Sequence, residues 1–404
     1  MTQQLYLADA WTRDFTARVT AHRVEGDKTW LSLDRSAFYP EGGGQPGDSG
    51  RLLAGDQVWQ VQDTQKDAQG QVWHAVTGPD GPPPVGSQVH GELDWARRFD
   101  HMQQHTGEHL IASCLYRLTG GFTHGLHIGR EVSTIDVTMP DNSTRLGQDV
   151  LDDIEALANR LITEDSPVTC RFPDAAELAG LPLRKDPTVQ EQVRVCAMGD
   201  YEMVACGGTH LSRTGQIGLV KLLGSEPARG KLRLSFLCGG RAVAHYVRVY
   251  KAVTRAGELL SAGVDELPGR LSEALRQAED NRRELGALRR QRSLAKLPGL
   301  LEQARVLPDG RRLVIAQLEE QDLPALEALA GEMVKHSGLI ALLCVPRAGR
   351  FNLLFARSPD VKADMAEFIR STGAKGGGRS DFARGAAADS LPWEAAQVMA
   401  PHLP

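Results

Sequence analysis

Two short motifs carry side chains that can bind a metal ion: His105-Thr106-Gly107-Glu108-His109 and Cys206-Gly207-Gly208-Thr209-His210. Histidines four residues apart lie on one face of a helix, so both imidazoles can reach the same ion. In the second motif, two glycines let the backbone fold tightly between a thiol and an imidazole. Three nitrogens and one sulfur suit Zn²⁺ better than Mg²⁺ or Ca²⁺. We therefore expect a catalytic Zn²⁺ centre with these ligands: His105, His109, Cys206 and His210.

Each motif also has a simpler interpretation when it is taken alone. Two histidines on one helix face are often a structural pair, and Cys-Gly-Gly is typical of a tight turn with a buried cysteine. The zinc hypothesis therefore depends on the two motifs meeting in one domain.

The residues before the first motif predict a small β-barrel. Apolar and polar residues alternate over 15–22 and 89–94, which is the period of a half-buried strand. Further short strands are expected over 29–33, 58–61 and 71–76.

The first motif lies in a predicted helix. Apolar residues recur at three- and four-residue spacing from Met102 to Leu118, and Thr119-Gly120-Gly121 ends the pattern. A strand at 132–137, a helix at 149–162 and further strands up to Cys238 predict a mixed α+β domain that contains both motifs.

Two helices are expected after this domain, with interruptions at Gly263 and Pro268-Gly269 and an end at Pro298-Gly299. Arginines interrupt the leucine seam of the second helix, which favours a short antiparallel hairpin over a dimeric zipper. The remaining residues alternate strand, helix, strand, strand and helix, with these ranges: 312–318, 323–334, 339–345, 351–356 and 361–369.

These patterns predict an α+β multidomain protein. Its expected parts are a small β-barrel domain, an α+β zinc domain, a helical linker or hairpin and a C-terminal α/β globular domain, at residues 1–95, 96–240, 241–300 and 301–404, respectively.

Composition excludes several classes of protein. The chain has 46 Lys and Arg against 51 Asp and Glu, a net charge of −5, so a polyanion must meet a local basic patch and not a uniformly basic surface. The longest apolar run, at 339–345, is too short for a membrane span. The first residues have no signal-peptide pattern, so we expect a cytoplasmic protein. Six scattered cysteines do not predict a disulfide framework.

Both motifs and several further stretches resemble one family. A His-x-x-x-His motif followed by Cys-x-x-x-His is similar to the editing domain of alanyl-tRNA synthetase and of its free-standing AlaX relatives. The resemblance includes a glycine-rich barrel motif, a strand pair, the end of the editing domain and the C-terminal globular domain, at 38–50, 126–136, 214–218 with 238–242, and 375–383, respectively. The barrel begins almost at residue 1, and no stretch resembles a class II aminoacylation core. The sequence therefore resembles a long-form AlaX protein, which edits in trans.

The resemblance implies a zinc-dependent hydrolase that releases serine from mischarged Ser-tRNA(Ala) and spares Ala-tRNA(Ala), with Gly-tRNA(Ala) as an open second substrate. A pocket for alanine rejects serine weakly, whereas a second pocket with hydrogen-bonding groups rejects alanine because those groups would be left unpaired. A catalytic zinc must keep or open one coordination position. We therefore expect one ligand, His210, to be loose or displaced.

The resemblance also implies roles for other residues. The expected substrate-binding residues are Gln45, Thr123, His127 and Thr209. The expected tRNA contacts are Arg241, Arg248 and Lys251, on a helix with Tyr246 and Tyr250 interleaved, and Lys375 and Arg379, at a glycine-rich loop over 373–378. The simpler alternatives are a turn cap for Thr123, pairing within a strand for His127 and a solvated helix face for Arg248 and Lys251. A homodimer through the C-terminal half is left open.

The other five cysteines are interpreted as core or strand residues that bind no metal: Cys114, Cys170, Cys196, Cys238 and Cys344.

Two alternative functions remain. His-x-x-Glu-His is also the motif of inverted zinc metallopeptidases, in which Glu108 would be the general base and a distant carboxylate the third ligand. Otherwise Glu108 is expected to face solvent or a neighbour on its helix. The third function is a non-catalytic tRNA-binding protein in which zinc only stabilises the fold.

Overall fold

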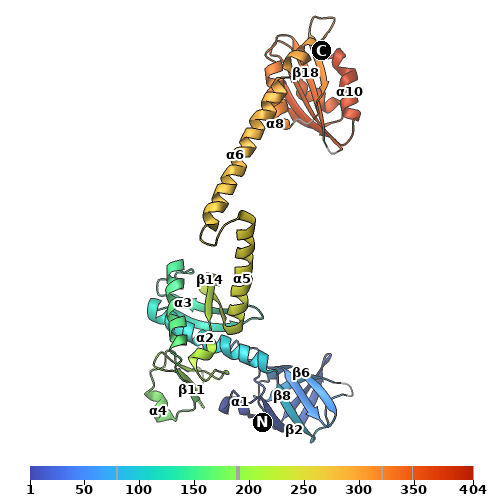
Figure 1. The fold of residues 1–404 in the computed structure, drawn as a ribbon. Helices are drawn as coiled ribbons and strands as arrows, with labels where there is room; N and C mark the ends of the chain where they lie inside the picture. The colour runs from blue at the N-terminus through green and yellow to red at the C-terminus, as the bar shows by residue number, and fades with distance from the viewer. Residues whose placement is uncertain (79–80, 188–191, 320–321, 348, 404) are drawn as a thin grey trace. The chain divides into compact units, whose positions relative to one another are not determined.

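The computed structural model describes all residues except 79–80, 188–191, 320–321, 348 and 404, and it divides the chain into two compact units, Met1–Val253 and Thr254–Pro404 (Figure 1). Helices and several separate sheets occur in the described chain, which confirms the α+β multidomain class. The finer boundaries at residues 95, 240 and 300 stay predictions.

A closed six-stranded barrel forms the N-terminal part of the first unit, as predicted. Along its first strand, Phe15, Ala17 and Val19 are buried in the barrel core, whereas the residues between them are exposed. The strands, in their order around the barrel, are β2 (Asp14–Glu25), β3 (Lys28–Leu33), β7 (Val72–Thr77), β6 (Gln57–Lys66), β5 (Gly50–Ala54) and β8 (Gln88–Leu93).

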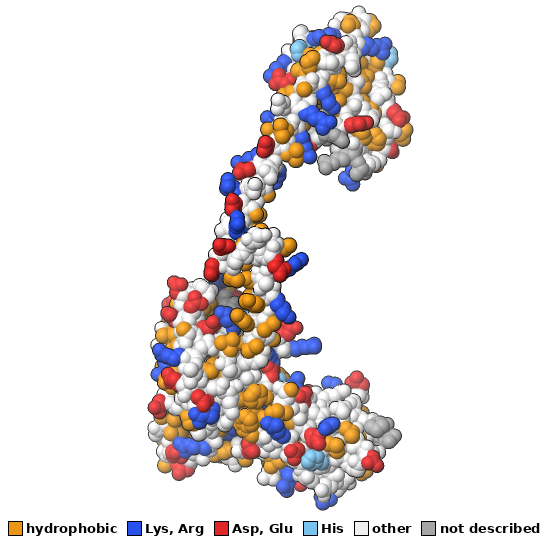
Figure 2. Space-filling view, viewed as in Figure 1, with side chains coloured by type: hydrophobic (Ala, Val, Ile, Leu, Met, Phe, Trp, Pro, Cys, Tyr) orange, Lys and Arg blue, Asp and Glu red, His pale blue; other side chains and the backbone are white. Residues whose placement is uncertain are grey.

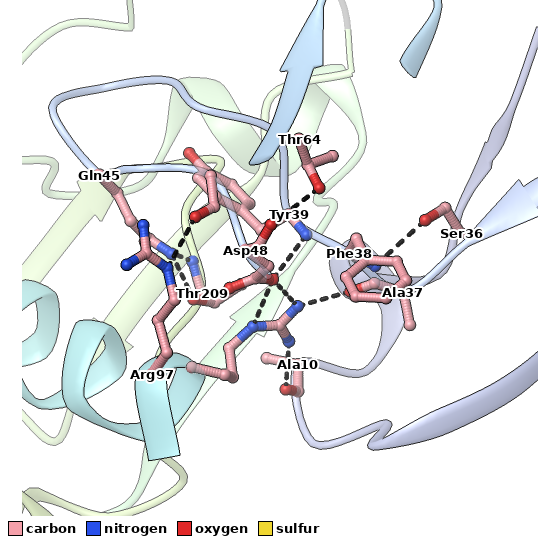
Figure 3. A network of polar contacts seen from close by, with 12 residues as sticks. Ala10, Ser36, Ala37, Phe38, Tyr39, Gln45, Asp48, Thr64, Arg97 and Thr209 are labelled. Atoms are coloured by element: carbon pink, nitrogen blue, oxygen red, sulfur yellow. Dashed lines mark hydrogen bonds and ion pairs between the residues drawn. The ribbon is translucent and has the colours of Figure 1, made fainter. Parts of the chain in front are cut away.

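Helix α2 (Trp95–Thr119) follows the barrel directly and carries the first motif. The Asp94 side chain caps its first turn by accepting a hydrogen bond from the backbone N–H of Arg97, and Gly120 ends it in a left-handed conformation. Arg98, in the first turn of α2, is fully buried, pairs with Asp48 and donates hydrogen bonds to the carbonyls of Ala10 and Ala37. Figure 3 shows Asp48, Ala10 and Ala37, which supply these contacts. Because a buried ion pair tolerates little displacement, Arg98 fixes α2 against the barrel.

The rest of the first unit has two small antiparallel sheets around a shared hydrophobic core. The larger sheet contains β14 (Val220–Ala228), β15 (Lys231–Cys238), β10 (Ser133–Thr138) and β9 (Phe122–Ile128), in that order. The smaller one contains β11 (Val168–Arg171), β12 (Val195–Met198) and β13 (Glu202–Ala205). Helix α3 (Gln148–Thr163) contributes Leu151, Ile154, Ala158, Leu161 and Ile162 to this core, as its sequence period predicts. The short remaining elements are β1 (Gln3–Gln4), α1 (Leu5–Ala8), β4 (Arg35–Ser36), α4 (Ala175–Ala179) and η1 (Thr214–Ile217).

The two helices expected after this domain are present as α5 (Gly239–Leu260) and α6 (Leu267–Leu294). Their antiparallel packing stays a prediction. Pro298-Gly299 does not end the helical region, because both residues lie at the start of a further helix, α7 (Leu297–Glu302), where a proline needs no hydrogen-bonded N–H. The end of α6 packs on α8 (Leu323–Met333), where Ser293 Oγ donates to the Ala325 carbonyl at 3.1 Å.

A six-stranded sheet dominates the second unit. Its strands, in spatial order, are β16 (Arg305–Val306), β17 (Arg312–Gln317), β18 (Leu339–Arg347), β19 (Arg350–Arg357), β21 (Phe382–Ala387) and β20 (Lys375–Gly378). The other elements are α9 (Met365–Ser371), α10 (Leu391–Met399) and η2 (Ala400–His402). The loop expected over 373–378 is wrong for most of its length, because Lys375–Gly378 pairs with β21 as an edge strand. In the described ranges, no helix combines the length and the apolar character that crossing a membrane requires.

Candidate metal centre

The side chains of the two motifs converge in the first unit. His105 and His109 lie on α2, Cys206 and His210 lie on the segment after β13, and their ligand atoms are all within 4.8 Å of one another. His105 Nε2 is 3.4 Å and His210 Nε2 is 3.2 Å from Cys206 Sγ. A tetrahedral zinc ion with usual bond lengths separates sulfur and nitrogen ligands by about 3.5 Å. These four residues, which we call the histidine cluster, are therefore a candidate metal site.

The segment that carries Cys206 must approach α2 closely. A Cβ atom at Gly208 would lie 2.2 Å from Cε1 of His105, so only glycine fits there. Arg194 also holds this segment, because its Nη1 donates to the carbonyls of Gly208 at 2.7 Å and Cys206 at 3.2 Å. Sequence reasoning missed Arg194, which belongs to neither motif.

A glutamine from the barrel orients His105. Oε1 of Gln45 accepts from Nδ1–H of His105 at 2.8 Å. Nε2 of Gln45 donates to Oγ1 of Thr209 at 2.8 Å, and Figure 3 shows these two side chains. With the ring proton on Nδ1, Nε2 of His105 is free to bind an ion, which is the usual arrangement behind a metal-binding histidine. Gln45 and Thr209 are both fully buried. The observed contacts therefore orient the ring of His105. The contacts with substrate that we expected of Gln45 and Thr209 stay predictions.

The glycine-rich motif that presents Gln45 is held against β9. Gly44 has φ +83°, and a Cβ atom there would lie 1.8 Å from the carbonyl oxygen of Leu126. The Gly44 carbonyl accepts from the N–H of Ile128 at 2.9 Å. This contact fixes the glycine-rich motif of the barrel relative to β9, in the sheet beside the site.

Burial sets the protonation of the histidine cluster. It lowers the pKa of His105 to about 3 and holds the pKa values of His109 and His210 well below the usual range, so all three imidazoles are neutral, as metal ligands must be. Burial also raises the pKa of the Cys206 thiol to about 12, so that thiol needs a cation to become a thiolate.

The polar atoms of this cluster also fit an ion. Both ring nitrogens of His109 and Nδ1 of His210 are buried and have no hydrogen-bond partner among the described residues. Buried polar atoms without a partner are rare in folded proteins and call for an unseen partner. Together with the three nitrogens and one sulfur, they fit Zn²⁺.

His210 is packed within the histidine cluster, and its expected displacement from a bound ion stays a prediction. Its side chain is buried, and its Nε2 is as close to Cys206 as that of His105. The rings of His105 and His210 are 4.7 Å apart, centroid to centroid, which leaves His210 enclosed by the other ligands.

Glu108 lies beside its helix neighbour and not in solvent. Its Oε2 is 3.5 Å from Nδ1 of His109, without hydrogen-bond geometry, and burial raises the pKa of its carboxyl to about 7. Among the described residues, Cys206 and His210 complete the histidine cluster, and no carboxylate does so. This ligand set disagrees with the peptidase hypothesis, which requires a carboxylate ligand.

Only one of the two residues expected after the helix is buried. Thr123 is buried, and its Oγ1 accepts from Nη1 of Arg184 at 3.1 Å. Arg184 is paired with the buried Glu202 through two bonds of 2.8 and 2.9 Å. The positive charge of Arg184 contributes to the low pKa of His109, so this network lies beside the histidine cluster. His127 is exposed on β9. Sequence reasoning missed Arg184 and Glu202, because no motif marks them.

The basic residues expected to contact tRNA differ in their exposure and in their ion pairs. Arg241 is mostly buried, pairs with Asp100 at 2.6 Å and donates to the Gly129 carbonyl at 2.7 Å, so a phosphate would have to compete with these partners. Arg248 and Lys251 are exposed on α5. Figure 2 shows blue and orange side chains together over this helix, which carries the exposed, stacked rings of Tyr246 and Tyr250.

The two basic residues at the glycine-rich strand are also exposed. Lys375 begins β20, and Arg379 follows it and pairs with Asp381 at 3.0 Å. Because β20 pairs with β21, part of its backbone N–H groups is already used in the sheet. Phosphate binding by this strand would therefore depend on its side chains more than the sequence suggested.

Comparisons with known proteins find similarity to tRNA synthetase families and to an alanyl-tRNA editing protein. The family model for tRNA synthetases class II (A) matches residues 12–97, and the one for the threonyl and alanyl tRNA synthetase second additional domain matches residues 193–235. The chain is 31% identical over 392 residues to the alanyl-tRNA editing protein AlaX-L of Pyrococcus horikoshii, and the match covers 95% of this chain and 94% of that protein.

Alanine–tRNA ligases match over the same length. Those of Pyrococcus abyssi and Pyrobaculum calidifontis are 32% and 33% identical, and each match covers 95% of this chain. The chain spans 42% of the length of both ligases. Among solved structures, the C-Ala domain of Aquifex aeolicus alanyl-tRNA synthetase matches 24% of this chain and 95% of that domain, with 21% identity and a TM-score of 0.23.

Proposed function

This chain belongs to the family of alanyl-tRNA editing proteins of the AlaX-L type, and from that premise we propose that it hydrolyses the ester bond of mischarged Ser-tRNA(Ala) and spares Ala-tRNA(Ala). The observation that carries the proposal is the convergence of His105, His109, Cys206 and His210 in one buried cluster. The same four residues are the proposed zinc ligands.

A bound zinc ion would supply a Lewis acid beside the ester. The protein's own groups support the remaining tasks. Gln45 keeps Nε2 of His105 directed at the ion, and Arg194 holds the segment of Cys206 and His210 in place. The ester is reactive enough that no covalent nucleophile is required from the chain.

Thr123 is the proposed sensor of the serine hydroxyl. Its Oγ1 already accepts from Arg184, so its own O–H remains to donate to a substrate hydroxyl. Alanine offers no acceptor at that position and would leave the buried Thr123 hydroxyl unpaired, which disfavours its binding. Arg248, Lys251, Lys375 and Arg379 are proposed to hold the tRNA by phosphate contacts. A homodimer through the C-terminal half stays a prediction.

The decisive experiment measures release of the amino acid from Ser-, Gly- and Ala-tRNA(Ala) by the full chain, with and without a chelator. We expect chelator-sensitive release of serine and none of alanine. The Cys206→Ala and His109→Ala variants should lose turnover, whereas Cys344→Ala, which removes a buried thiol in the second unit, should keep it.

Two outcomes would replace this proposal. Absence of hydrolysis by zinc-loaded protein, together with tRNA binding that weakens steeply with salt, would mean that the metal only stabilises a tRNA-binding protein. Cleavage of peptides that survives Cys206→Ala but not Glu108→Gln would mean a peptidase.

A further inference from the structure

Two further cysteines lie beside the histidine cluster. Cys170 on β11 and Cys196 on β12 are directly opposite each other across two antiparallel strands. Both sulfur atoms and one ring nitrogen of His210 lie within 4.8 Å of one another. We call Cys170, Cys196 and His210 the thiol cluster. The sequence analysis took Cys170 as a strand residue and Cys196 as a core residue, expected neither to bind a metal, and did not place them next to an imidazole.

His210 is shared by the two clusters. Its Nε2 is 3.2 Å from Cys206, in the histidine cluster, whereas its Nδ1 is buried and has no hydrogen-bond partner among the described residues. A metal-binding histidine almost always gives its second ring nitrogen a defined partner. One ring nitrogen of His210, Nδ1 or Nε2, lies within 4.8 Å of the two sulfur atoms of the thiol cluster, which are soft ligands.

The thiol cluster has a route to solvent. Cys196 is fully buried, but Cys170 is partly exposed and lines an open pocket of about 480 Å³. The other lining residues are Thr2, Gln4, Leu7, Ala8, Phe172 and Gln192. An ion can therefore reach Cys170 without passing through the histidine cluster.

We propose that Cys170, Cys196 and His210 form a second metal site that takes a thiophilic d¹⁰ cation such as Zn²⁺ or Cd²⁺. Two sulfurs and one imidazole nitrogen match the ligands that such ions prefer, and the pocket beside Cys170 leaves a fourth position for an external ligand. Binding converts both thiols into thiolates and releases two protons to solvent, and a third proton leaves the His210 ring if that imidazole bridges the two ions.

Because His210 belongs to both clusters, occupation of one site changes the other. An ion at the thiol cluster either shares the imidazole through its second nitrogen or competes for it. In both cases the ions of the two sites are energetically coupled.

The test counts ions on the metal-free full chain under a reductant that contains no thiol. Cd²⁺ is added stepwise, native mass spectrometry counts bound ions and ultraviolet absorption follows the cadmium–thiolate bonds. We expect two ions on the unaltered chain and on Cys344→Ala. Cys170→Ala and Cys196→Ala should keep the first ion and bind the second at least about tenfold more weakly, the lower end of the loss seen when one partner of a metal site is removed.

Two further variants test whether a lost ion reflects misfolding and which site holds each ion. Cys170→Ser keeps the size of the partly exposed side chain, so loss of the second ion in this variant cannot be attributed to a cavity. His109→Ala should lose the first ion and keep the second. Circular dichroism must show the same folded content in all variants.

The proposal is overturned if the unaltered chain binds one ion, or if a second ion binds Cys170→Ala and Cys196→Ala with unchanged affinity, which would make it adventitious. Neither result depends on tRNA, so the second site and the proposed deacylation can fail independently.

Discussion

At the scale of single residues, the spacing of the two motifs was enough to name the four proposed metal ligands, but not the residues that orient them. Gln45 and His105 are 60 positions apart in sequence, and their hydrogen bond exists only because the barrel packs against α2. Arg184 and Arg194 belong to no recognisable motif, and their contacts likewise exist only because separate segments of the chain pack together. Local spacing predicts which atoms one helix or turn brings together, whereas partners from distant segments depend on packing.

A first prediction concerns Gln45. Gln45→Ala removes the acceptor for Nδ1–H of His105, and we expect zinc affinity to fall by about 10- to 100-fold, as it does when other outer partners of metal-binding histidines are lost. Competition with a chromophoric chelator measures this change. Gln45→Glu keeps an acceptor for Nδ1–H of His105, so its zinc affinity should fall less than that of Gln45→Ala.

Gln60→Ala is the matched control, because this glutamine is exposed on the barrel strand β6. Equal zinc affinity in Gln45→Ala and Gln60→Ala would show that Gln45 does not act on the metal through His105.

At the scale of helices and strands, elements with a clear period were predicted and those without one were missed. The helix of the first motif and the strands of the barrel follow their apolar periods closely. Strand β5 was missed, because it is short and begins at a glycine. Strand β20 was taken for a loop, because three of its four residues are glycines, and only its pairing with β21 makes it a strand.

A second prediction concerns the barrel and His74. This histidine is fully buried, its Nδ1–H donates to the Leu31 carbonyl at 3.2 Å and its Nε2 accepts from Ser36 at 2.9 Å. Burial lowers its pKa from 6.5 to about 4. As the pH falls, the unfolded chain therefore binds a proton at His74 before the folded barrel does. The free energy of unfolding is highest above about pH 6.5 and decreases between about pH 6.5 and 4, by about 3 kcal/mol in total.

Urea unfolding at several pH values, followed by tryptophan fluorescence, measures this loss. Five of the six tryptophans lie in the first unit, so the signal reports mainly on that unit. His74→Gln should reduce the slope of stability against pH in this window, whereas the more exposed His90→Gln should not. An unchanged slope in His74→Gln would assign the pH dependence to the other buried histidines.

At the scale of the whole molecule, the chain combines a net charge of −5 with a local basic surface on α5. Composition alone excluded a uniformly basic protein but could not say which of the predicted arginines is exposed. Arg241 and Arg248 looked equivalent in sequence, and the structure separates them. Arg241 is paired with the carboxylate of Asp100, whereas Arg248 is exposed and donates to Nδ1 of His245 at 3.0 Å.

A third prediction follows for tRNA. Arg248→Ala should weaken binding of tRNA of any sequence and lower the steepness of the logarithmic salt dependence by about 1, because one phosphate contact is lost. Titrations at several salt concentrations measure both quantities.

Lys335→Ala is the control, because Lys335 is exposed but paired with Glu332 at 2.7 Å. Equal salt dependence in the two variants would mean that Arg248 lies on a solvated helix face and does not contact tRNA.

Among the described residues, each hydrophobic core lies within one of the two units, and residues 261–266, between α5 and α6, are almost all exposed. That segment is a natural crossover point for gene recombination. A mosaic chain joined there would take each of these cores whole from one parent, so we expect N-terminal and C-terminal halves of different family members to fold when they are joined at this segment.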